Sequence, residues 1–473
     1  MNILMLANNP CTHDARIIRE AEALAGAGHS VLVLSHWAAR QATAETLNGV
    51  TYRRICVNFS QRIAAHKHNK ISDAIDASKS TEVIKPQLAS SPMANPIKKT
   101  HEKISIQPLR KLTRQIYSKY RTLAFKAYNN TCALARNTYR SLRKIIQVNF
   151  LTGTVISLIR HAIHYKASTL PWKPDVVHSH DLYTLLAGAL IARKTGAKLI
   201  YDSHELETGR NGNFSCWELW LRARIEWLLI IKTDRVITVS DSIANYLQTL
   251  YSIPKPVVVL NAPATENYKH SKKHIRQTIG LSKEVPLAIY IGLVSINRGL
   301  EKCVMALVHA RNLHLATIGP RYEPLTKKMI ALANELGVAN RLHFIDSVPH
   351  DEVVSFVRSA DVSLIPIQNS CLSYKYCFPN KLLESLFAGL PIAVARLVEL
   401  EKMVEITSAG LVFDETNPKS ISSGIMEIIE NREMYIINPE EMVQLRSNYC
   451  WERQCKVLIE LYQTLELEVT EDS

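Results

Sequence analysis

Four polar segments of this sequence each follow a predicted strand and carry side chains that could bind or transform a ligand. Three of them, residues 8–16, 177–181 and 201–205, contain histidine and aspartate, and the fourth, residues 378–384, contains lysine and glutamate. In an open parallel sheet, ligands bind at the carboxyl ends of the strands, where such segments gather. A single histidine or aspartate there is often only a helix cap, but three such segments in one half of the chain favour a binding site.

The glycine motifs of common nucleotide-binding proteins are missing from the sequence. It has 16 glycines and no G-x-x-x-x-G-K-[ST] segment, which argues against a P-loop nucleotidase. Its one G-x-G, Gly26-Ala27-Gly28, follows the first predicted helix instead of opening it, and this placement excludes a dinucleotide fingerprint. A ligand site must therefore be built from the polar segments at the strand ends.

Short apolar runs alternate with helical patterns through most of the chain, and these elements would position the polar segments. The predicted strands of the first half are residues 3–6, 30–34, 175–178, 198–202, 235–239 and 256–260. Those of the second half are residues 287–291, 313–318, 341–344, 362–366, 391–395 and 410–413. The alternation predicts an α/β protein with two doubly wound domains.

These patterns also give a division of the chain. We assign residues 1–60 and 171–263 to an N-terminal domain and residues 264–445 to a C-terminal domain, whose polar start, up to residue 284, is a linker and entry helix. Apolar residues between Trp451 and Leu465 recur at helical spacing. We therefore expect residues 446–473 to form a helix that packs back on the N-terminal domain.

The positive charge of the chain is concentrated in one segment. The whole chain has a net charge of +14, but residues 61–170 hold 20 lysines and arginines and only 4 acidic residues, so the remainder is nearly neutral. The apolar and charged fractions, 47% and 21%, exclude wholesale disorder. We find no apolar run long enough for a membrane span and no signal peptide.

Residues 61–170 interrupt the alternation, and we interpret them as a basic insertion in the first domain, flexible at first and then helical. Apolar residues within 109–127 form one helical stripe, and Arg110, Lys111, Arg114 and Arg121 lie opposite it. One hypothesis is that this helix binds an anionic membrane surface. The alternative is that the stripe packs on the first domain and the charges face water. Nucleic acid is disfavoured as a partner because no nucleic-acid motif accompanies the charge.

The cysteines point to a reducing compartment and away from a metal centre. There are nine, an odd number, and none forms a C-x-x-C pair. Without a signal peptide, this pattern is typical of a cytosolic protein with free thiols. His66 and His68 have no partners at ligand spacing, so we predict no zinc site.

Read in order, several segments resemble the retaining GT-B glycosyltransferases of family 4 (glycosyl transferases group 1). The segments that carry the resemblance are residues 14–16, 28–31, 174–181, 202–205, 234–240, 290–300, 318–319, 360–366 and 379–391. The resemblance implies two Rossmann-like domains facing across a cleft, with the basic helical insertion in the first. It covers most of the chain apart from that insertion and the extreme C-terminus.

The resemblance also implies a nucleotide-sugar donor in the cleft. Departure of the nucleotide builds negative charge on its diphosphate, and fixed cations lower that barrier. Arg298 and Lys381 match residues that hold the diphosphate, and Glu384 matches the carboxylate that holds the ribose hydroxyls. Asn380 lies beside Lys381 at the start of a predicted helix, which is itself an anion site.

Further residues are assigned by the same resemblance. Gly292 and Gly319 would let the backbone approach the donor. His180 matches the histidine near the transferred sugar, and we include it with Arg298 and Lys381 as catalytic. Asp14, Arg16 and Asp181 would bind substrate from the N-terminal side. No Asp-x-Asp metal motif of the other glycosyltransferase fold is present, so we expect neither a metal nor another cofactor.

Two departures from the family pattern leave alternatives open. Tyr376 stands where many members have a carboxylate that reaches the donor sugar, and Leu293 stands where many have an arginine. We predict a cytoplasmic or peripheral-membrane enzyme that moves a sugar from a UDP- or GDP-linked donor to a saccharide or lipid-linked acceptor of the cell envelope. A nucleotide-sugar epimerase and a non-catalytic nucleotide-sugar-binding homologue are the alternatives.

Overall fold

The structure is a computed structural model, and its described residues make up most of the chain. It describes residues 1–55 except 13 and 39–40; residues 158, 161, 162, 165 and 166; and residues 173–471 except 213, 215 and 266–270. The cationic helix predicted within 109–127, and nearly all of the predicted basic insertion, lie outside this part. Among the described helices, none is long and apolar enough to cross a membrane.

The N-terminal half is built on an eight-stranded sheet with the strand order β3-β4-β2-β1-β5-β6-β7-β8. The strands are β1 (Asn2–Leu6), β2 (Ser30–His36), β3 (Ala44–Leu47), β4 (Val50–Ile55), β5 (Val176–His180), β6 (Lys198–Ser203), β7 (Arg235–Thr238) and β8 (Val257–Val258). The helices are α1 (Ala15–Gly26), α5 (Leu182–Thr195), the 3-10 helix η1 (Glu207–Gly209), α6 (Cys216–Ile230) and α7 (Asp241–Tyr251). All strand pairs are parallel except β3 with β4.

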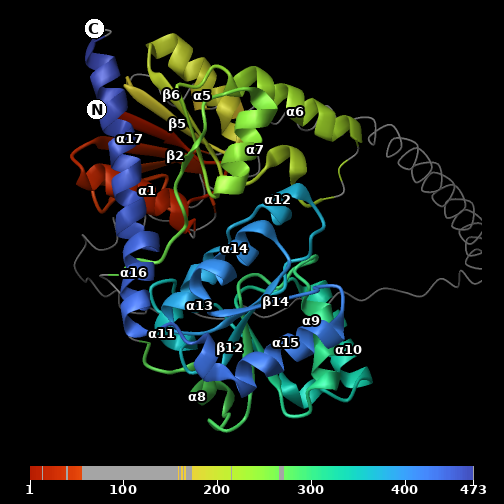
Figure 1. Cartoon of the computed structure of the whole chain (residues 1–473). Coiled ribbons are helices and arrows are strands. Elements are labelled where there is room, and N and C mark those ends of the chain that lie inside the picture. The colour runs from red at the N-terminus through yellow and green to blue at the C-terminus, as the bar shows by residue number, and fades with distance from the viewer. Residues whose placement is uncertain are drawn as a thin grey trace, which may run out of the picture. The chain divides into compact units, whose positions relative to one another are not determined.

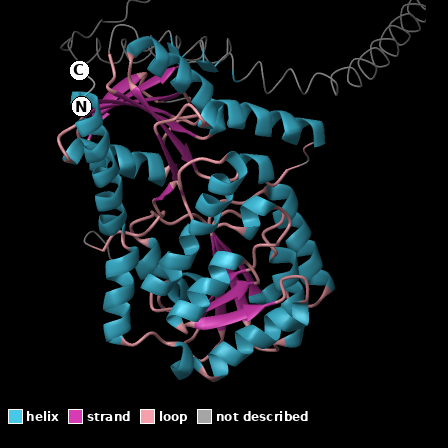
Figure 2. Ribbon diagram, turned by 45° about the horizontal axis from the view of Figure 1, so that its top comes forward, coloured by secondary structure: helices cyan, strands magenta, loops and turns pink. Residues whose placement is uncertain are grey.

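The C-terminal half has a six-stranded parallel sheet with the order β11-β10-β9-β12-β13-β14. Its strands are β9 (Leu287–Ile291), β10 (His314–Ile318), β11 (Leu342–Ile345), β12 (Val362–Ile365), β13 (Ile392–Ala395) and β14 (Gly410–Phe413). Its helices are α8 (Ile275–Ile279), α9 (Leu300–Ala306), η2 (Leu307–His309), α10 (Glu323–Glu335), η3 (Ala339–Arg341), α11 (Val353–Val357), α12 (Leu372–Lys375), α13 (Asn380–Phe387), α14 (Val398–Thr407), α15 (Pro418–Glu430), η4 (Arg432–Tyr435) and α16 (Pro439–Tyr449). The predicted α/β class with two Rossmann-like domains is confirmed (Figures 1 and 2).

The predicted strands agree with the structure to within a few residues, except that β8 is only Val257–Val258. The sequence analysis missed one hairpin, β3–β4. Its turn is Asn48-Gly49, and both residues have positive φ, 49° and 79°. Asn-Gly is the preferred pair for such a two-residue hairpin turn, so this dipeptide was the available signal.

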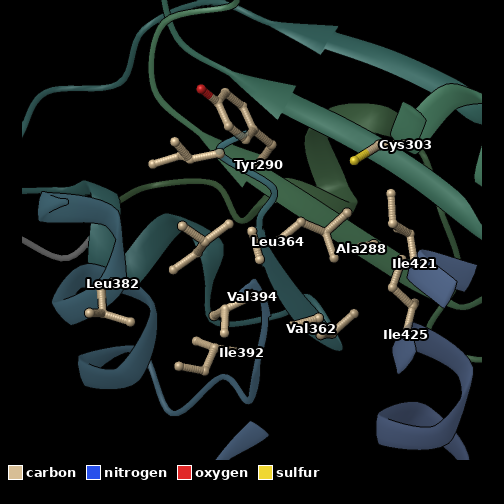
Figure 3. Packing of buried hydrophobic residues seen from close by; sticks show 14 of the residues in the cluster. Ala288, Tyr290, Cys303, Val362, Leu364, Leu382, Ile392, Val394, Ile421 and Ile425 are labelled. Carbon is tan, nitrogen blue, oxygen red and sulfur yellow. The ribbon is translucent and has the colours of Figure 1, made fainter. Parts of the chain in front are cut away.

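Each sheet is covered on both faces, and this explains why its strands are continuously apolar. In β9, Ala288 and Tyr290 enter a core with β12, β13, α13 and α15, which Figure 3 shows from close by. The alternate residues Leu287, Ile289 and Ile291 point to a second core on the opposite face. Strand β9 is thus central to the C-terminal half and fixes where its carboxyl end lies.

The last helix, α17 (Trp451–Glu471), returns to the N-terminal half. Its buried residues Leu458, Leu461, Tyr462 and Leu465 share a core with residues of β1 and β2. Figure 1 shows α17 beside α1 and the N-terminal sheet, although it follows the C-terminal half in the sequence. The backbone N–H of Trp451 also donates to the carbonyl of Pro263 (2.9 Å).

We predict that Leu458→Ala lowers the free energy of unfolding by about 2–5 kcal/mol, because it opens a cavity where α17 meets the N-terminal core. Leu467→Ala, on the same helix but 67% exposed, is the control and should change stability by less than about 0.5 kcal/mol. Urea denaturation followed by circular dichroism measures both. Equal losses for the two variants would contradict this packing of α17.

Candidate active site

A cleft of about 670 Å³ lies where the carboxyl ends of strands from the two sheets approach each other. Its N-terminal wall contains residues from the segments after β1 and β6, and its C-terminal wall contains residues from the turns after β9 and β10 and from α13. Eight residues predicted from the sequence line it: Asp14, Arg16, Gly292, Arg298, Gly319, Asn380, Lys381 and Glu384. His180 and Asp181 are not among its lining residues.

Two cations form the centre of the C-terminal wall. The Lys381 ammonium lies 3.6 Å from the centroid of the Tyr290 ring, and the Arg298 guanidinium lies 4.7 Å from that of Tyr374. Neither forms an ion pair with a carboxylate within the described residues. Burial lowers the pKa of Lys381 well below its usual range, and the neighbouring charge of Arg298 lowers it further. A bound anion would offset both effects.

One nitrogen atom of Arg298 lacks a hydrogen-bond partner. The Nε of Arg298 is buried and has no hydrogen-bond partner in the structure. A buried donor left unsatisfied costs about 1–3 kcal/mol. The Nε atoms of Arg222 and Arg446 are also unpartnered, but of these three arginines only Arg298 lines the cleft, where a ligand can complete it. The geometry therefore fits an anionic ligand between Arg298 and Lys381.

Two glycine turns bring the backbone close to the same place. Gly292, after β9, has a φ of 118°, and Gly319, after β10, has a φ of 137°. A Cβ on Gly319 would lie 2.6 Å from the carbonyl oxygen of Gly292, and one on Gly292 would lie 3.3 Å from Nζ of Lys381. Both positions therefore require glycine, and the turns leave room for a ligand against the backbone.

Helix α13 brings the remaining predicted residues into the cleft. It begins at Asn380 and has no side-chain cap at Pro379, so N–H groups of its first turn are open to an anion. Glu384 lies one turn further along and is almost fully buried. Burial raises the pKa of its carboxyl group, while His350 and Lys381 oppose that shift.

The sequence analysis did not single out His350. It lies in the loop between β11 and α11, and its Nδ1 is 3.5 Å from Oε1 of Glu384. No motif marks this histidine, because it meets Glu384 only through the packing of the C-terminal half.

Arg16 lines the N-terminal wall but is held by the protein itself. Its Nε and Nη2 donate to the two carboxylate oxygens of Asp202 at 2.9 and 2.8 Å. Its Nη1 donates to the carbonyl of Val259 (2.6 Å), and Glu20 is 3.1 Å from Nε. The guanidinium is buried and its donors are engaged, so Arg16 positions Asp202 rather than offering hydrogen bonds to a ligand.

Of the histidines in the polar segments 177–181 and 201–205, His204 lines the cleft, and the predicted His180 does not. The His204 side chain is 17% exposed, whereas His180 is 1% exposed and lies behind it, with 3.1 Å between His180 Nδ1 and His204 Nε2. Asp202 Oδ2 is 3.1 Å from His204 Nε2, and Asp181 Oδ2 is 3.9 Å from His204 Nδ1. Asp181 therefore faces His204 instead of lining the cleft.

These contacts give the histidines opposite charge preferences. Burial opposes the charged form of His204, but Asp181 and Asp202 outweigh it and raise the pKa to about 9. Burial, with the charge of His178, lowers the pKa of His180 well below its usual value. His204 is thus a cation at the cleft surface, and His180 is a neutral neighbour that orients it.

The same network contains the one group of described residues whose ligand atoms are close enough to consider a metal: Glu20, His178, His180 and Asp202, within 4.8 Å. The residue types suit a divalent cation. However, Arg16 already holds both oxygens of Asp202, and burial raises the pKa of Glu20 to about 8, which favours its neutral form. Arg16 therefore supplies the positive charge that this cluster needs.

Of the two residues that depart from the family pattern, Leu293 lines the cleft and Tyr376 does not. Tyr376 is absent from the cleft lining: its ring lies 5.9 Å from that of Tyr246 in the N-terminal half, and its carbonyl accepts a hydrogen bond from Ser240 (2.7 Å). Leu293 lines the cleft and is half-exposed. Tyr376 thus joins the two halves, and Leu293 offers the cleft no charge.

Two families of known proteins match the chain. Residues 271–442 match the family described as glycosyl transferases group 1, and residues 131–263 match glycosyltransferase family 4. An uncharacterized glycosyltransferase of Methanocaldococcus jannaschii is 25% identical over 343 residues, which cover 69% of this chain and 84% of that protein.

Solved structures of glycosyltransferases share the fold. Sucrose-phosphate synthase of Thermosynechococcus elongatus has a TM-score of 0.69 at 13% identity and covers 99% of this chain and 100% of its own. Anabaena HepE, in complex with UDP-glucose, has a TM-score of 0.59 at 12% identity, with 98% and 100% covered. WaaG, a glycosyltransferase involved in lipopolysaccharide biosynthesis, has a TM-score of 0.53 at 12% identity, with 96% and 98% covered.

We predict that His204 makes the protein lose stability at alkaline pH. Its raised pKa means that its stabilising contribution is complete below about pH 6.5 and is lost as the pH rises through 9. Between about pH 7 and pH 10, the free energy of unfolding should fall by roughly 2 kcal/mol more in the wild type than in His204→Gln.

Urea denaturation at several pH values measures this difference. Asp181, Asp202, His180 and Arg16 remain in both proteins, so the comparison isolates the proton on His204. Parallel pH curves for the two proteins would show that His204 is not held charged by Asp181 and Asp202.

Proposed function

Because the chain is a glycosyltransferase with the GT-B fold, we propose that it transfers a sugar from a UDP- or GDP-linked donor to a cell-envelope polysaccharide or glycolipid, with retention of anomeric configuration. We place this activity in the cytoplasm. The observation that carries the proposal is a pair of basic side chains that have no carboxylate partner among the described residues, the partly buried Arg298 and the buried Lys381, beside the start of α13 in the cleft.

The donor diphosphate fits this pair. Breaking the anomeric C–O bond leaves negative charge on the departing diphosphate and positive charge on the sugar. Arg298 can meet two phosphate oxygens at once through its fork of N–H groups, one of which is the unpartnered Nε. Lys381 and the open N–H groups of α13 add positive potential at the diphosphate. These groups are already in place, so they need not rearrange during the reaction.

The nucleoside then extends toward Glu384. A buried carboxylate one turn into α13 can accept hydrogen bonds from both ribose hydroxyls. His350 lies beside this carboxylate, with 3.5 Å between its Nδ1 and Oε1 of Glu384. The glycine turns at Gly292 and Gly319 leave the backbone open to the donor.

The transferred sugar would lie against the N-terminal wall. His204, charged and partly exposed, faces the cleft there, and Asp14 lines the same wall. We assign His204 the sugar-contacting role that the family resemblance implied for His180, with His180 as a positioning residue behind it. HepE, solved in complex with UDP-glucose, and WaaG, involved in lipopolysaccharide biosynthesis, support the donor and acceptor classes.

One observation keeps a second candidate open. Tyr376, in place of the family carboxylate, lies outside the cleft lining, so this chain offers the donor sugar one acidic contact fewer. This favours a homologue that binds nucleotide sugar without transfer. The epimerase alternative requires conversion of a nucleotide sugar in the absence of an acceptor.

We predict that Arg298→Ala and Lys381→Met each lower kcat/KM by roughly a hundred- to a thousandfold, since each removes a cation aimed at the departing diphosphate. Nucleotide release from a panel of UDP- and GDP-sugars, with and without saccharide acceptors, identifies the donor and gives the rates. Lys328→Met, on α10 and largely exposed, is the matched control and should retain wild-type rates.

The outcomes separate the candidates. Full turnover by Arg298→Ala would contradict the proposal. Conversion of a nucleotide sugar without acceptor would indicate the epimerase, and calorimetric binding without turnover on any acceptor would indicate the non-catalytic homologue.

We also predict that Glu384→Gln weakens binding of the nucleoside diphosphate by roughly tenfold, because a carboxylate that accepts two hydroxyl hydrogen bonds is lost. Binding of inorganic diphosphate, which has no ribose, should not change. Thermal shift titrations with UDP, GDP and diphosphate measure both, since a ligand of the native state raises the melting temperature. An equal loss for diphosphate would place Glu384 at the phosphates instead of the ribose.

A further inference from the structure

Helix α6 exposes an apolar stripe along its outer side. Trp217, Trp220 and Trp227 are 51%, 46% and 41% exposed, and Leu228 and Ile231 are about half exposed. The spacing of these residues places them on one face of the helix. Figure 1 labels α6 at the margin of the N-terminal half. A continuous exposed apolar face of this kind marks an interaction surface more often than scattered single residues do.

The inner side of the same helix is charged and buried. Glu218, Arg222 and Glu226 are 4%, 3% and 1% exposed. Glu226 accepts hydrogen bonds from Tyr201 (2.8 Å) and Tyr251 (2.6 Å), and Arg222 donates to Glu207 and Glu218 at 3.3 Å. These buried contacts fix the rotation of α6, because turning the apolar face inward would expose or break all of them.

The chemistry of the outer face combines indole rings with positive charge. Trp217 and Trp220 stack with centroids 4.6 Å apart, and the Arg224 guanidinium lies 5.5 Å from the Trp220 centroid. Lys232, just after the helix, is also exposed. Both acidic residues of α6 face inward, so the described outer face of this helix presents cations and no carboxylate.

We propose that this face of α6, defined by Trp217, Trp220, Arg224, Trp227, Leu228 and Ile231, docks on the headgroup layer of an anionic lipid membrane. Tryptophan side chains prefer the boundary between headgroups and acyl chains, and arginine and lysine are attracted to anionic headgroups. This docking depends only on the exposed residues of α6 and the residues just after it, so it does not depend on which donor and acceptor the enzyme uses.

The place of α6 relative to the cleft makes such docking useful. The segment between η1 and α6 contains Asn211, which donates to the hydroxyl of Tyr374 (3.2 Å) and accepts from Asn297 (2.8 Å). Tyr374 lines the cleft. The segment that leads into α6 therefore contacts the wall of the cleft, and a short stretch of chain links the helix to the active site.

Two other occupants compete for this face: a second copy of the chain, and the apolar stripe predicted within residues 109–127, whose alternative role is to pack on the first domain. A symmetric pair formed through α6 would set the same cations, Arg224 and Lys232, close to their own copies with no exposed carboxylate on α6 to compensate. Anionic lipid supplies that compensation. Charge complementarity thus favours the membrane over self-association.

The test uses the full chain with vesicles of phosphatidylglycerol and phosphatidylcholine. We expect the wild type to co-sediment with them and its tryptophan emission to shift to shorter wavelength, because three of its six tryptophans lie on this face. The triple variant Trp217→Ser, Trp220→Ser, Trp227→Ser should bind at least about tenfold more weakly. Arg224→Gln with Lys232→Gln should weaken binding to anionic vesicles and leave binding to pure phosphatidylcholine unchanged.

A matched control removes exposed apolar side chains elsewhere. Ile406→Ser, Val443→Ser and Leu467→Ser, which are 53%, 69% and 67% exposed, should bind vesicles as the wild type does. Residues 109–127 are present in every protein, so any contribution from them is constant. Circular dichroism and nucleotide binding show whether each variant is folded.

Three results would overturn the proposal. They are no vesicle binding by the wild type, equal binding by the folded triple variant, and a wild-type dimer that the triple variant loses without any vesicle binding. The last result would assign this face to a second copy.

Discussion

The buried pair of Arg16 and Asp202 organises the N-terminal wall of the cleft. It joins α1 to β6, and through the carbonyl of Val259 it reaches the segment after β8. A guanidinium removed from water must be compensated, so Asp202 cannot move away from it at low cost. Asp202 in turn lies within 3.2 Å of a nitrogen of both His180 and His204. The orientation of His204, which lines the cleft, therefore depends on the buried pair of Arg16 and Asp202.

The end of the chain is tied to the same network. Tyr462 of α17 lies 2.8 Å from Nδ1 of His178 through its hydroxyl, and its ring belongs to the core under β1 and β2. Helix α17 thus connects the C-terminal half to the polar centre of the N-terminal half.

The two walls of the cleft differ in their charge balance. The charged groups of the N-terminal wall pair with one another, whereas Arg298 and Lys381 of the C-terminal wall have no carboxylate partners among the described residues. Such an imbalance is costly in an empty site and is relieved by an anionic ligand.

Helix α6 also buries its charged side chains, and its apolar side chains are exposed instead. Its carboxylates accept hydrogen bonds from Arg222 and from tyrosine hydroxyls inside the N-terminal half. Because these polar groups are buried, the apolar residues of the helix are left on its outer side. The polar side of α6 therefore faces the interior of the N-terminal half, and its apolar side is exposed.

The sequence by itself determined the alternating strands and helices, the α/β class with two Rossmann-like domains, and the residues of α13 that reach the cleft. The strands and helices are local features that apolar runs report directly, whereas the glycine turns and the residues of α13 were assigned by resemblance to the family. Only the tertiary structure decided that Arg16 is held by Asp202, that His204 stands in front of His180, and that His350 meets Glu384. It also decided that the tryptophans of α6 face outward. Burial and charge pairing depend on partners from distant segments, and no periodicity within one segment records which of its sides those partners will cover.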